Sequence, residues 1–334
     1  MNRFNNEVYE ALINDLIYDS FYIEDRPFRG KIATIRQYSE IILRKIFDIP
    51  ETEQVTLGKQ SIQSQIDSRN NALLKNSVEI IRSFGNDNTH TKNVKSPTAE
   101  DFDKVIEALM NLYSYLFIDY FEKYRFGSNE IIMNTFSLLP PVIRNITLQN
   151  LYMNDKNNPA IIYKLSLAIL KAQDKITALK WINDEKEQLE KVIYISENEL
   201  HVIKQIPALY DVIPKNMYEF CINKINDVNE ILNNNGILYK TFEEAKSYYE
   251  QYGHINGNSP EIMEFNSIMN FCYIGRHKFG YPKDIKSYQI WNFRKINTKQ
   301  RFEADSESSQ LRYNQLLHVH PTGVQEEKKI CINQ

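Results

Sequence analysis

Apolar side chains recur every three or four residues along almost the whole chain, and this spacing limits the possible folds more than any other feature. It places apolar residues on one face of a helix, whereas a half-buried strand would need them at alternate positions. The pattern is clear in the segments 8–21, 32–46, 57–66, 72–84, 102–125, 143–151, 162–170, 178–192 and 262–274. Only 10 Gly and 11 Pro occur among 334 residues, which is few for a fold rich in strands and turns. We therefore predict an all-α protein.

Two interruptions of this helical pattern divide the chain, which is long for a single hydrophobic core. The first is Phe126-Gly127-Ser128-Asn129 and the second is the Asn-Asn-Asn-Gly run at 233–236. We predict three regions: a helical bundle at 1–127, a helical middle domain at 128–235, and a mainly helical C-terminal domain with a short tail at 236–334.

Residues typical of helix ends predict where individual helices begin and end. Thr98 with Asp101, Ser196 with Glu199, and Thr241 with Glu244 each have the spacing of a capping box at a helix start. Pro159 is expected to open another helix, because proline is favoured in the first turn. Gly85 is expected to end the helix at 72–84 in a left-handed conformation.

Composition limits the compartment and the classes of partner. The formal net charge of -3 gives no overall attraction for nucleic acid, so any nucleic-acid contact requires a local basic patch. Cys221, Cys272 and Cys331 are odd in number and widely spaced, which favours a reducing compartment over a disulfide framework. The first residues lack the apolar core of a signal peptide, and no apolar run is long enough to span a bilayer. These features predict a cytoplasmic protein without membrane association.

The segment Arg82-Ser-Phe-Gly-Asn-Asp-Asn-Thr-His90 concentrates more chemistry than any other part of the chain. A histidine beside a helix end can accept or donate a proton near neutral pH. Arg82 can bind a phosphate or a developing negative charge through its planar set of donors. Asn86 and His90 are four residues apart, so a helical turn would place them on the same face. Arg82, Asn86 and His90 are therefore the candidate catalytic residues.

The same residues resemble a signature of the HEPN superfamily of small helical bundles. In one bacterial subset the signature reads Arg-x-x-Gly-Asn-x-x-x-His, and Arg82, Gly85, Asn86 and His90 match it position by position. The resemblance covers about residues 5–126, a little over a third of the chain, and the flanking helical patterns agree with it. It implies an N-terminal HEPN-like bundle followed by further helical regions.

The resemblance also implies a function. HEPN ribonucleases cut RNA without a metal ion, at a site formed by an Arg–His pair from each of two protomers. His90 would then activate the ribose 2′-hydroxyl, Arg82 would stabilise the phosphate, and Asn86 would position the histidine or the substrate. A homodimer that acts on RNA in antiviral defence or as a toxin, with an antitoxin or other protein partner, is the corresponding expectation.

A non-catalytic function agrees with the same residues. Gly85 stands where active members usually have arginine, and seven residues intervene between Arg82 and His90. Many HEPN-like domains serve for dimerisation or nucleotide binding alone. The N-terminal bundle would then be a scaffold that dimerises, while the rest of the chain senses a protein or a nucleic acid.

Basic and aromatic residues alternate near residue 280 and suggest a second surface. Arg276, His277 and Lys278 precede several aromatic residues, a combination seen where single-stranded nucleic acid stacks on a protein. Packing explains the same pattern, so both interpretations stay open. The pair His318 and His320 has a spacing compatible with a metal ion but lacks a nearby carboxylate or cysteine. We expect no metal ion and no cofactor, because no phosphate-binding loop, dinucleotide fingerprint or zinc-protease motif occurs.

Overall fold

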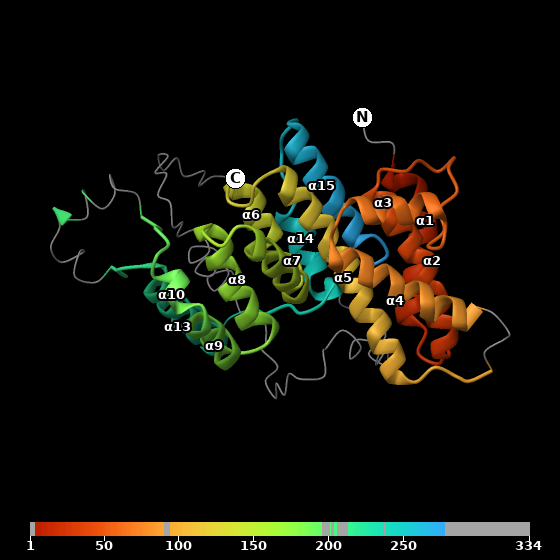
Figure 1. The fold of residues 1–334 in the computed structure, drawn as a ribbon, viewed down its shortest axis with the longest axis horizontal. Coiled ribbons are helices and arrows are strands. Elements are labelled where there is room, and N and C mark those ends of the chain that lie inside the picture. Colours follow the sequence, from red (N-terminus) through yellow and green to blue (C-terminus); the bar gives the residue numbers. More distant parts are fainter. Residues whose placement is uncertain are drawn as a thin grey trace. The chain divides into compact units, whose positions relative to one another are not determined.

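The computed structural model describes residues 4–89, 94–195, 201, 204–205, 213–234, 236 and 238–277. Every regular element in these residues is a helix, which confirms the predicted all-α class. Their contacts form two compact units (Figure 1). The first consists of the residues up to Leu151 together with those from Tyr239 onward, and the second of Tyr152–Leu238.

The N-terminal part of the first unit is a helical bundle. Its elements are α1 (Asn6–Ile17), the π-helical turn η1 (Tyr18–Tyr22), α2 (Phe28–Ile46), α3 (Gln60–Ser68), α4 (Ala72–Thr89) and α5 (Ala99–Lys123). Helices α2, α4 and α5 pack on one another and form its centre (Figure 1). The long helix α5 contributes most to the core, because fifteen of its 25 residues are buried.

Four more helices complete the first unit or begin in it. They are α6 (Glu130–Phe136), α7 (Pro141–Asn154), α14 (Phe242–Tyr252) and α15 (Pro260–Tyr273). Helix α15 packs against α5, where the ring of Phe265 lies 5.3 Å from Tyr120 and 6.2 Å from Phe117. The described residues 239–277 therefore share a core with the N-terminal bundle, whereas the sequence predicts a separate C-terminal domain for them.

The second unit consists of α8 (Pro159–Ala172), α9 (Lys175–Asp184), α10 (Lys186–Leu189) and α13 (Met217–Asn234). Helices α8, α9 and α13 contact one another. Tyr163 of α8 and Phe220 of α13 meet edge to face with ring centres 5.4 Å apart, so aromatic contacts stabilise this core as well.

The helix starts follow the capping signals where the structure describes them. Thr98 with Asp101 and Thr241 with Glu244 form complete capping boxes, and Pro159 lies in the first turn of α8. Ser196 and Glu199 lie outside the described residues. The predicted break at Phe126–Asn129 is present but short, because Asn129 accepts hydrogen bonds from Ile131 and Ile132 and so starts α6.

Candidate functional site

The C-terminal half of α4 carries the described part of the Arg82–His90 motif. The helix continues without a break to Thr89, and Gly85 is not left-handed, so the expectation that Gly85 ends the helix is wrong. Arg82, Gly85, Asn86 and Thr89 lie three or four residues apart and thus share one helix face. His90 and the three residues after it are outside the described residues. The structure therefore places two of the three candidate catalytic residues, Arg82 and Asn86.

Arg82 is paired with a carboxylate of its own helix. Its Nε donates to Glu79 Oε2 at 2.9 Å, and an Nη donates to Glu79 Oε1 at 2.7 Å. The hydrogen bonds from Arg82 lower the pKa of the Glu79 carboxyl, as expected for a two-pronged pair. Both groups are largely exposed, so the pair contributes little to stability. A phosphate can therefore replace Glu79 at low cost.

A second arginine, Arg36 of α2, lies against the same face of α4. Its side chain crosses Gly85, and one Nη donates to Thr89 Oγ1 at 3.3 Å. The Nε of Arg36 is buried without a hydrogen-bond partner, and no carboxylate of the described residues forms an ion pair with it. Arg36 thus brings a positive charge to the motif, and this charge also acts on Glu40 of α2, where burial raises the pKa of the carboxyl and Arg36 lowers it. Sequence patterns missed it because 46 residues separate it from Arg82.

The contact with Arg36 explains why position 85 is a glycine. A Cβ at Gly85 would lie 2.9 Å from Cγ and 3.0 Å from Cβ of Arg36, and closer still to its Cδ. These distances are shorter than van der Waals contact, and Arg36 Cβ is fixed to the backbone of α2. The lack of a side chain at position 85 therefore allows α2 and α4 to pack closely at this point.

Replacement of Gly85 by alanine should consequently destabilise the protein, although alanine favours helix formation by about 1 kcal/mol. We expect overpacking to outweigh that gain and to lower the free energy of unfolding by about 1–3 kcal/mol. Urea unfolding followed by circular dichroism measures the change. Gly58→Ala is the control, because an added Cβ there meets nothing within 4 Å. Arg36→Ala/Gly85→Ala should recover part of the stability, because alanine at position 36 removes the close Cγ and Cδ but keeps the Cβ. An unchanged stability of Gly85→Ala alone would contradict this account.

The second predicted surface is not formed by Arg276. This residue is buried, and its guanidinium lies 3.2 Å from Glu243 Oε1 and donates to the Tyr113 hydroxyl at 2.9 Å. Arg276 therefore stabilises the interior, where Glu243 compensates its charge, and its guanidinium is not exposed to a nucleic acid. His277 is half-buried, its ring lies 4.7 Å from that of Tyr22, and burial lowers its pKa. Lys278, like His318 and His320, lies outside the described residues.

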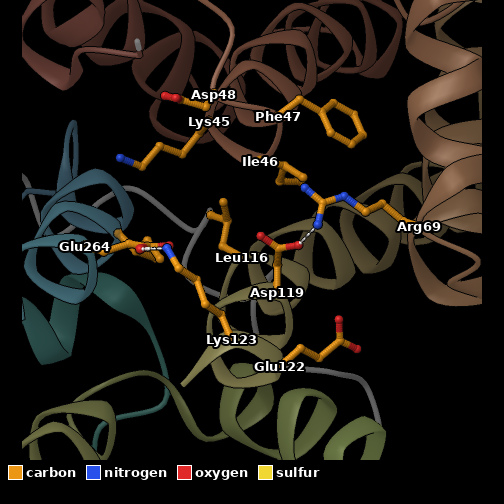
Figure 2. Close-up of a pocket in the computed structure, with 11 residues that line it drawn as sticks. Lys45, Ile46, Phe47, Asp48, Arg69, Leu116, Asp119, Glu122, Lys123 and Glu264 are labelled. Atoms are coloured by element: carbon orange, nitrogen blue, oxygen red, sulfur yellow. Dashed lines mark hydrogen bonds and ion pairs between the residues drawn. The ribbon is translucent and has the colours of Figure 1, made fainter. Parts of the chain in front are cut away.

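A cavity of about 430 Å³ lies elsewhere in the first unit, at the junction of α2, α3, α5 and α15 (Figure 2). Its apolar lining consists of Ile46, Phe47, Leu116 and Ile268. Its charged lining consists of Lys45, Asp48, Arg69, Asp119, Glu122, Lys123 and Glu264. Two ion pairs, Arg69 with Asp119 and Lys123 with Glu264, lie on opposite sides of Leu116 (Figure 2).

Local structure positions the charged side chains of this cavity. The left-handed conformation of Asp48, with φ at 52°, ends the segment after α2 and lets its carboxylate accept the Phe4 N–H at 2.8 Å. Asp119, Glu122 and Lys123 follow one another on a single face of α5. Burial is the main cause that raises the pKa of the carboxyls of Asp119 and Glu122, and burial lowers the pKa of the Lys45 amine to about 8. Sequence patterns gave no signal for this site, because its residues come from four distant segments.

Other kinds of site are not apparent in the described residues. No three His, Cys, Asp or Glu side chains among them are grouped so that they could hold a metal ion. Cys221 and Cys272 are buried thiols, and burial raises the pKa of Cys221 to about 12, which disfavours a reactive thiolate. No helix in the described part of the chain is long and apolar enough to cross a membrane.

Fold and site together define an all-α protein with an arginine-lined helix face and a separate charged cavity. Comparison of the chain with protein-family models, curated proteins and solved structures found no match.

Proposed function

We propose that the chain is a HEPN-like protein that acts on RNA through the C-terminal half of α4, as a metal-independent endoribonuclease of antiviral defence or toxin type. The observation that supports this most is the position of Arg36, whose aliphatic stem packs against Gly85 and whose guanidinium donates to Thr89 of the motif helix. His90 follows Thr89 directly in the sequence. Two arginines and an imidazole would then belong to one small site.

The proposed chemistry requires no cofactor. His90 takes the proton from a ribose 2′-hydroxyl, and the 2′ oxygen attacks the adjacent phosphorus. The bond from phosphorus to the 5′ oxygen breaks, which leaves a 2′,3′-cyclic phosphate, and the 5′ oxygen leaves as a hydroxyl with the proton that the imidazole of His90 took up. Arg36 and Arg82 stabilise the negative charge that develops on the phosphate, after Arg82 has exchanged Glu79 for the substrate. Asn86, half-buried one turn beyond Arg82, positions the substrate or the histidine.

The proposed active form is a homodimer in the cytoplasm. In the HEPN ribonucleases that the motif resembles, each of two protomers contributes an Arg–His pair to a single site. A pair of motif faces would double the local positive charge, which a chain with a net charge of -3 needs in order to hold RNA.

Expression of the wild type and of single variants in a bacterial host tests the proposal. We expect growth arrest and broken RNA with the wild type, and a loss of cleavage of about 10²–10⁴-fold in His90→Ala, because a general base contributes about that much. Arg36→Ala and Arg82→Ala should each lose about tenfold or more, because each removes a charge-assisted contact to the phosphate. The purified wild type should cut RNA equally well in excess EDTA.

Lys104→Ala is the matched control, because Lys104 is an exposed cation on α5, outside the motif face. This variant should arrest growth as the wild type does. RNA cleavage that survives in His90→Ala, or that requires a divalent ion, would contradict the proposal. Each variant should first be shown by circular dichroism to be folded.

One observation favours a second candidate function, a non-catalytic scaffold that dimerises and senses a protein or a nucleic acid. The two-pronged pair of Arg82 with Glu79 satisfies the arginine without any substrate. A scaffold predicts a dimer by light scattering, intact RNA with both wild type and His90→Ala, and co-purification of a partner such as an antitoxin.

A further inference from the structure

A groove of about 760 Å³ lies in the first unit, between the start of α1, the segment 254–258 and α15. It shares no lining residue with the cavity of Figure 2, and no residue of α4 lines it. Its volume lies in the range of ligand sites, roughly 300–1,000 Å³. Most of its polar lining consists of side-chain amides, which belong to Asn5, Asn6, Asn256, Asn258, Asn266 and Asn270. A ligand in this groove would therefore be independent of the proposed action on RNA.

Two of these amides fix the walls of the groove. Asn266 of α15 binds both main-chain groups of Ile255, because its Oδ1 accepts the N–H at 3.3 Å and its Nδ2 donates to the carbonyl at 2.8 Å. Asn6 Nδ2 donates to the carbonyl of Ser267 at 2.9 Å and so holds the start of α1 against α15. The groove is thus preformed, and Asn266 shows how an asparagine here can bind a peptide main chain.

The charge of the lining is negative. Glu7 and Glu10 are three residues apart on α1, so they share one helix face, and both are exposed. Neither carboxylate forms an ion pair with a described residue, and no Lys or Arg of the described residues lines the groove. His254 is the one other titratable residue of this lining. A cationic ligand is therefore favoured, and an RNA phosphate would be repelled.

Lys45 contacts the lining but leaves the two carboxylates of α1 available. Its Nζ donates to Ser267 Oγ at 2.6 Å and to Asn6 Oδ1 at 3.1 Å. Burial lowers the pKa of this amine, and the carboxylates that act against this shift are those of Asp48 and Glu264. The charge of Lys45 is thus partly balanced by residues of the other cavity, and not by the carboxylates of the groove.

Several amide groups of the groove are available to a ligand. The Oδ1 of Asn5 accepts a main-chain N–H of α1 at 2.9 Å, and the Oδ1 of Asn270 accepts the hydroxyl of Tyr249. Both side chains keep an NH2 group that can donate to a carbonyl oxygen. The exposed side chains of Asn256 and Asn258 form no hydrogen bond with the described residues, so each offers both a donor and an acceptor.

An extended peptide with a basic side chain matches both the amides and the charge. Its main chain presents N–H and carbonyl groups to the amides, and its cation meets the carboxylates. A polyamine has no acceptor for the NH2 groups of the asparagines. A neutral sugar would leave the carboxylates without a cation, and Phe4, the one Phe, Tyr or Trp of the lining, is too buried to stack on a sugar ring.

We propose that this groove binds an extended, basic peptide segment of a partner protein, with the peptide main chain at the asparagines. A Lys or Arg side chain of the peptide pairs with Glu7 and Glu10. The groove would give the first unit a protein contact that is separate from the α4 motif.

Titration calorimetry on the full chain tests the proposal with three pools of acetylated, amidated pentapeptides. The central residue is lysine, glutamine or glutamate, and the other positions are randomised over uncharged residues. Spermidine, a cation without carbonyl groups, is a fourth probe. We expect the lysine pool to bind, and the other three probes to bind at least about tenfold more weakly. No binding of the lysine pool, or equal binding of any other probe, would overturn the proposal.

Two double variants test the two parts of the groove separately. Glu7→Gln/Glu10→Gln should weaken binding of the lysine pool by about tenfold and abolish its preference over the glutamine pool, because the charge-assisted contact is lost. Asn256→Ala/Asn258→Ala should weaken binding by about threefold or more, because two amides are removed. All four residues are exposed, so both variants should fold normally, which circular dichroism checks.

Glu107→Gln and Asn233→Ala are the matched controls, because they alter exposed residues that do not line the groove. Both should bind the lysine pool as the wild type does. Unchanged affinity in folded Glu7→Gln/Glu10→Gln would refute the cation site, and unchanged affinity in folded Asn256→Ala/Asn258→Ala would refute the contact with the peptide main chain.

Discussion

Arg276→Met is expected to lower the free energy of unfolding of the first compact unit by about 3–5 kcal/mol. The side chain of Arg276 is fully buried and that of Glu243 is 3% exposed, so the substitution leaves a carboxylate inside the protein without its cation. Tyr22 still donates to Glu243 Oε1 at 2.6 Å, but one neutral donor compensates a buried charge only in part. Urea unfolding followed by circular dichroism measures the loss.

The aromatic surroundings of Arg276 add to this effect. The guanidinium carbon lies 4.8 Å from the ring centre of Phe242, 5.3 Å from that of Phe21 and 5.8 Å from that of Tyr113. Contacts of a desolvated cation with aromatic faces are each worth about 0.5–2 kcal/mol. Burial lowers the pKa of Arg276, but Tyr113 and Glu243 outweigh it and the pKa is raised, so the group stays charged.

A double-mutant comparison separates the effect of losing the ion pair from the effect of leaving one charge buried without a partner. Arg276→Met/Glu243→Met removes both charges and should be clearly more stable than Arg276→Met, since two apolar side chains of similar volume replace the pair. Lys104→Met breaks an exposed pair with Glu100 and should change stability by less than about 1 kcal/mol. A similarly small effect of Arg276→Met would show that Arg276 is not held in the interior.

Local signals in the sequence were sufficient for most helices and helix starts. The apolar spacing places α2, α5, α8 and α15 and the start of α4 correctly, because helical periodicity depends only on residues within a few turns. Local spacing does not tell which distant helix covers a given face. The first unit includes Phe265 and Arg276, which contact Phe117 and Tyr113 on α5. The partners in each contact are more than 140 residues apart in the sequence, so no local pattern predicts them.

The residues of the candidate site show the same limit. Arg82 and Asn86 were visible because they lie in one short motif, and their common helix face follows from their spacing. Arg36 could not be identified from the sequence, since only the packing of α2 against Gly85 brings it to the motif. Arg276 was a candidate for a nucleic-acid surface as well as for packing, because alternating basic and aromatic residues fit both an exposed and a buried position. The four-segment cavity has no counterpart in any local pattern.

The amine of Lys45 is expected to make the stability of the first unit rise with pH above neutrality. Burial lowers its pKa from 10.5 to about 8, and one pKa unit corresponds to about 1.4 kcal/mol, so up to about 3 kcal/mol is involved. Below pH 8 both folded and unfolded states carry the proton, and the folded state bears the full cost of burying the charge. Between pH 8 and 10.5 the unfolded chain binds more protons, so stability rises with pH, and above 10.5 the cost is absent.

Comparison with Lys45→Met isolates this contribution, because burial also lowers the pKa of Lys31 and Lys240 and these groups titrate in the same direction. The difference in unfolding free energy between Lys45→Met and the wild type should be most favourable to the variant near pH 7 and should shrink steadily towards pH 10. Loss of the bonds to Asn6 and Ser267 adds an offset that does not depend on pH. A difference that stays constant from pH 7 to 10 would mean that the amine titrates as an exposed lysine does.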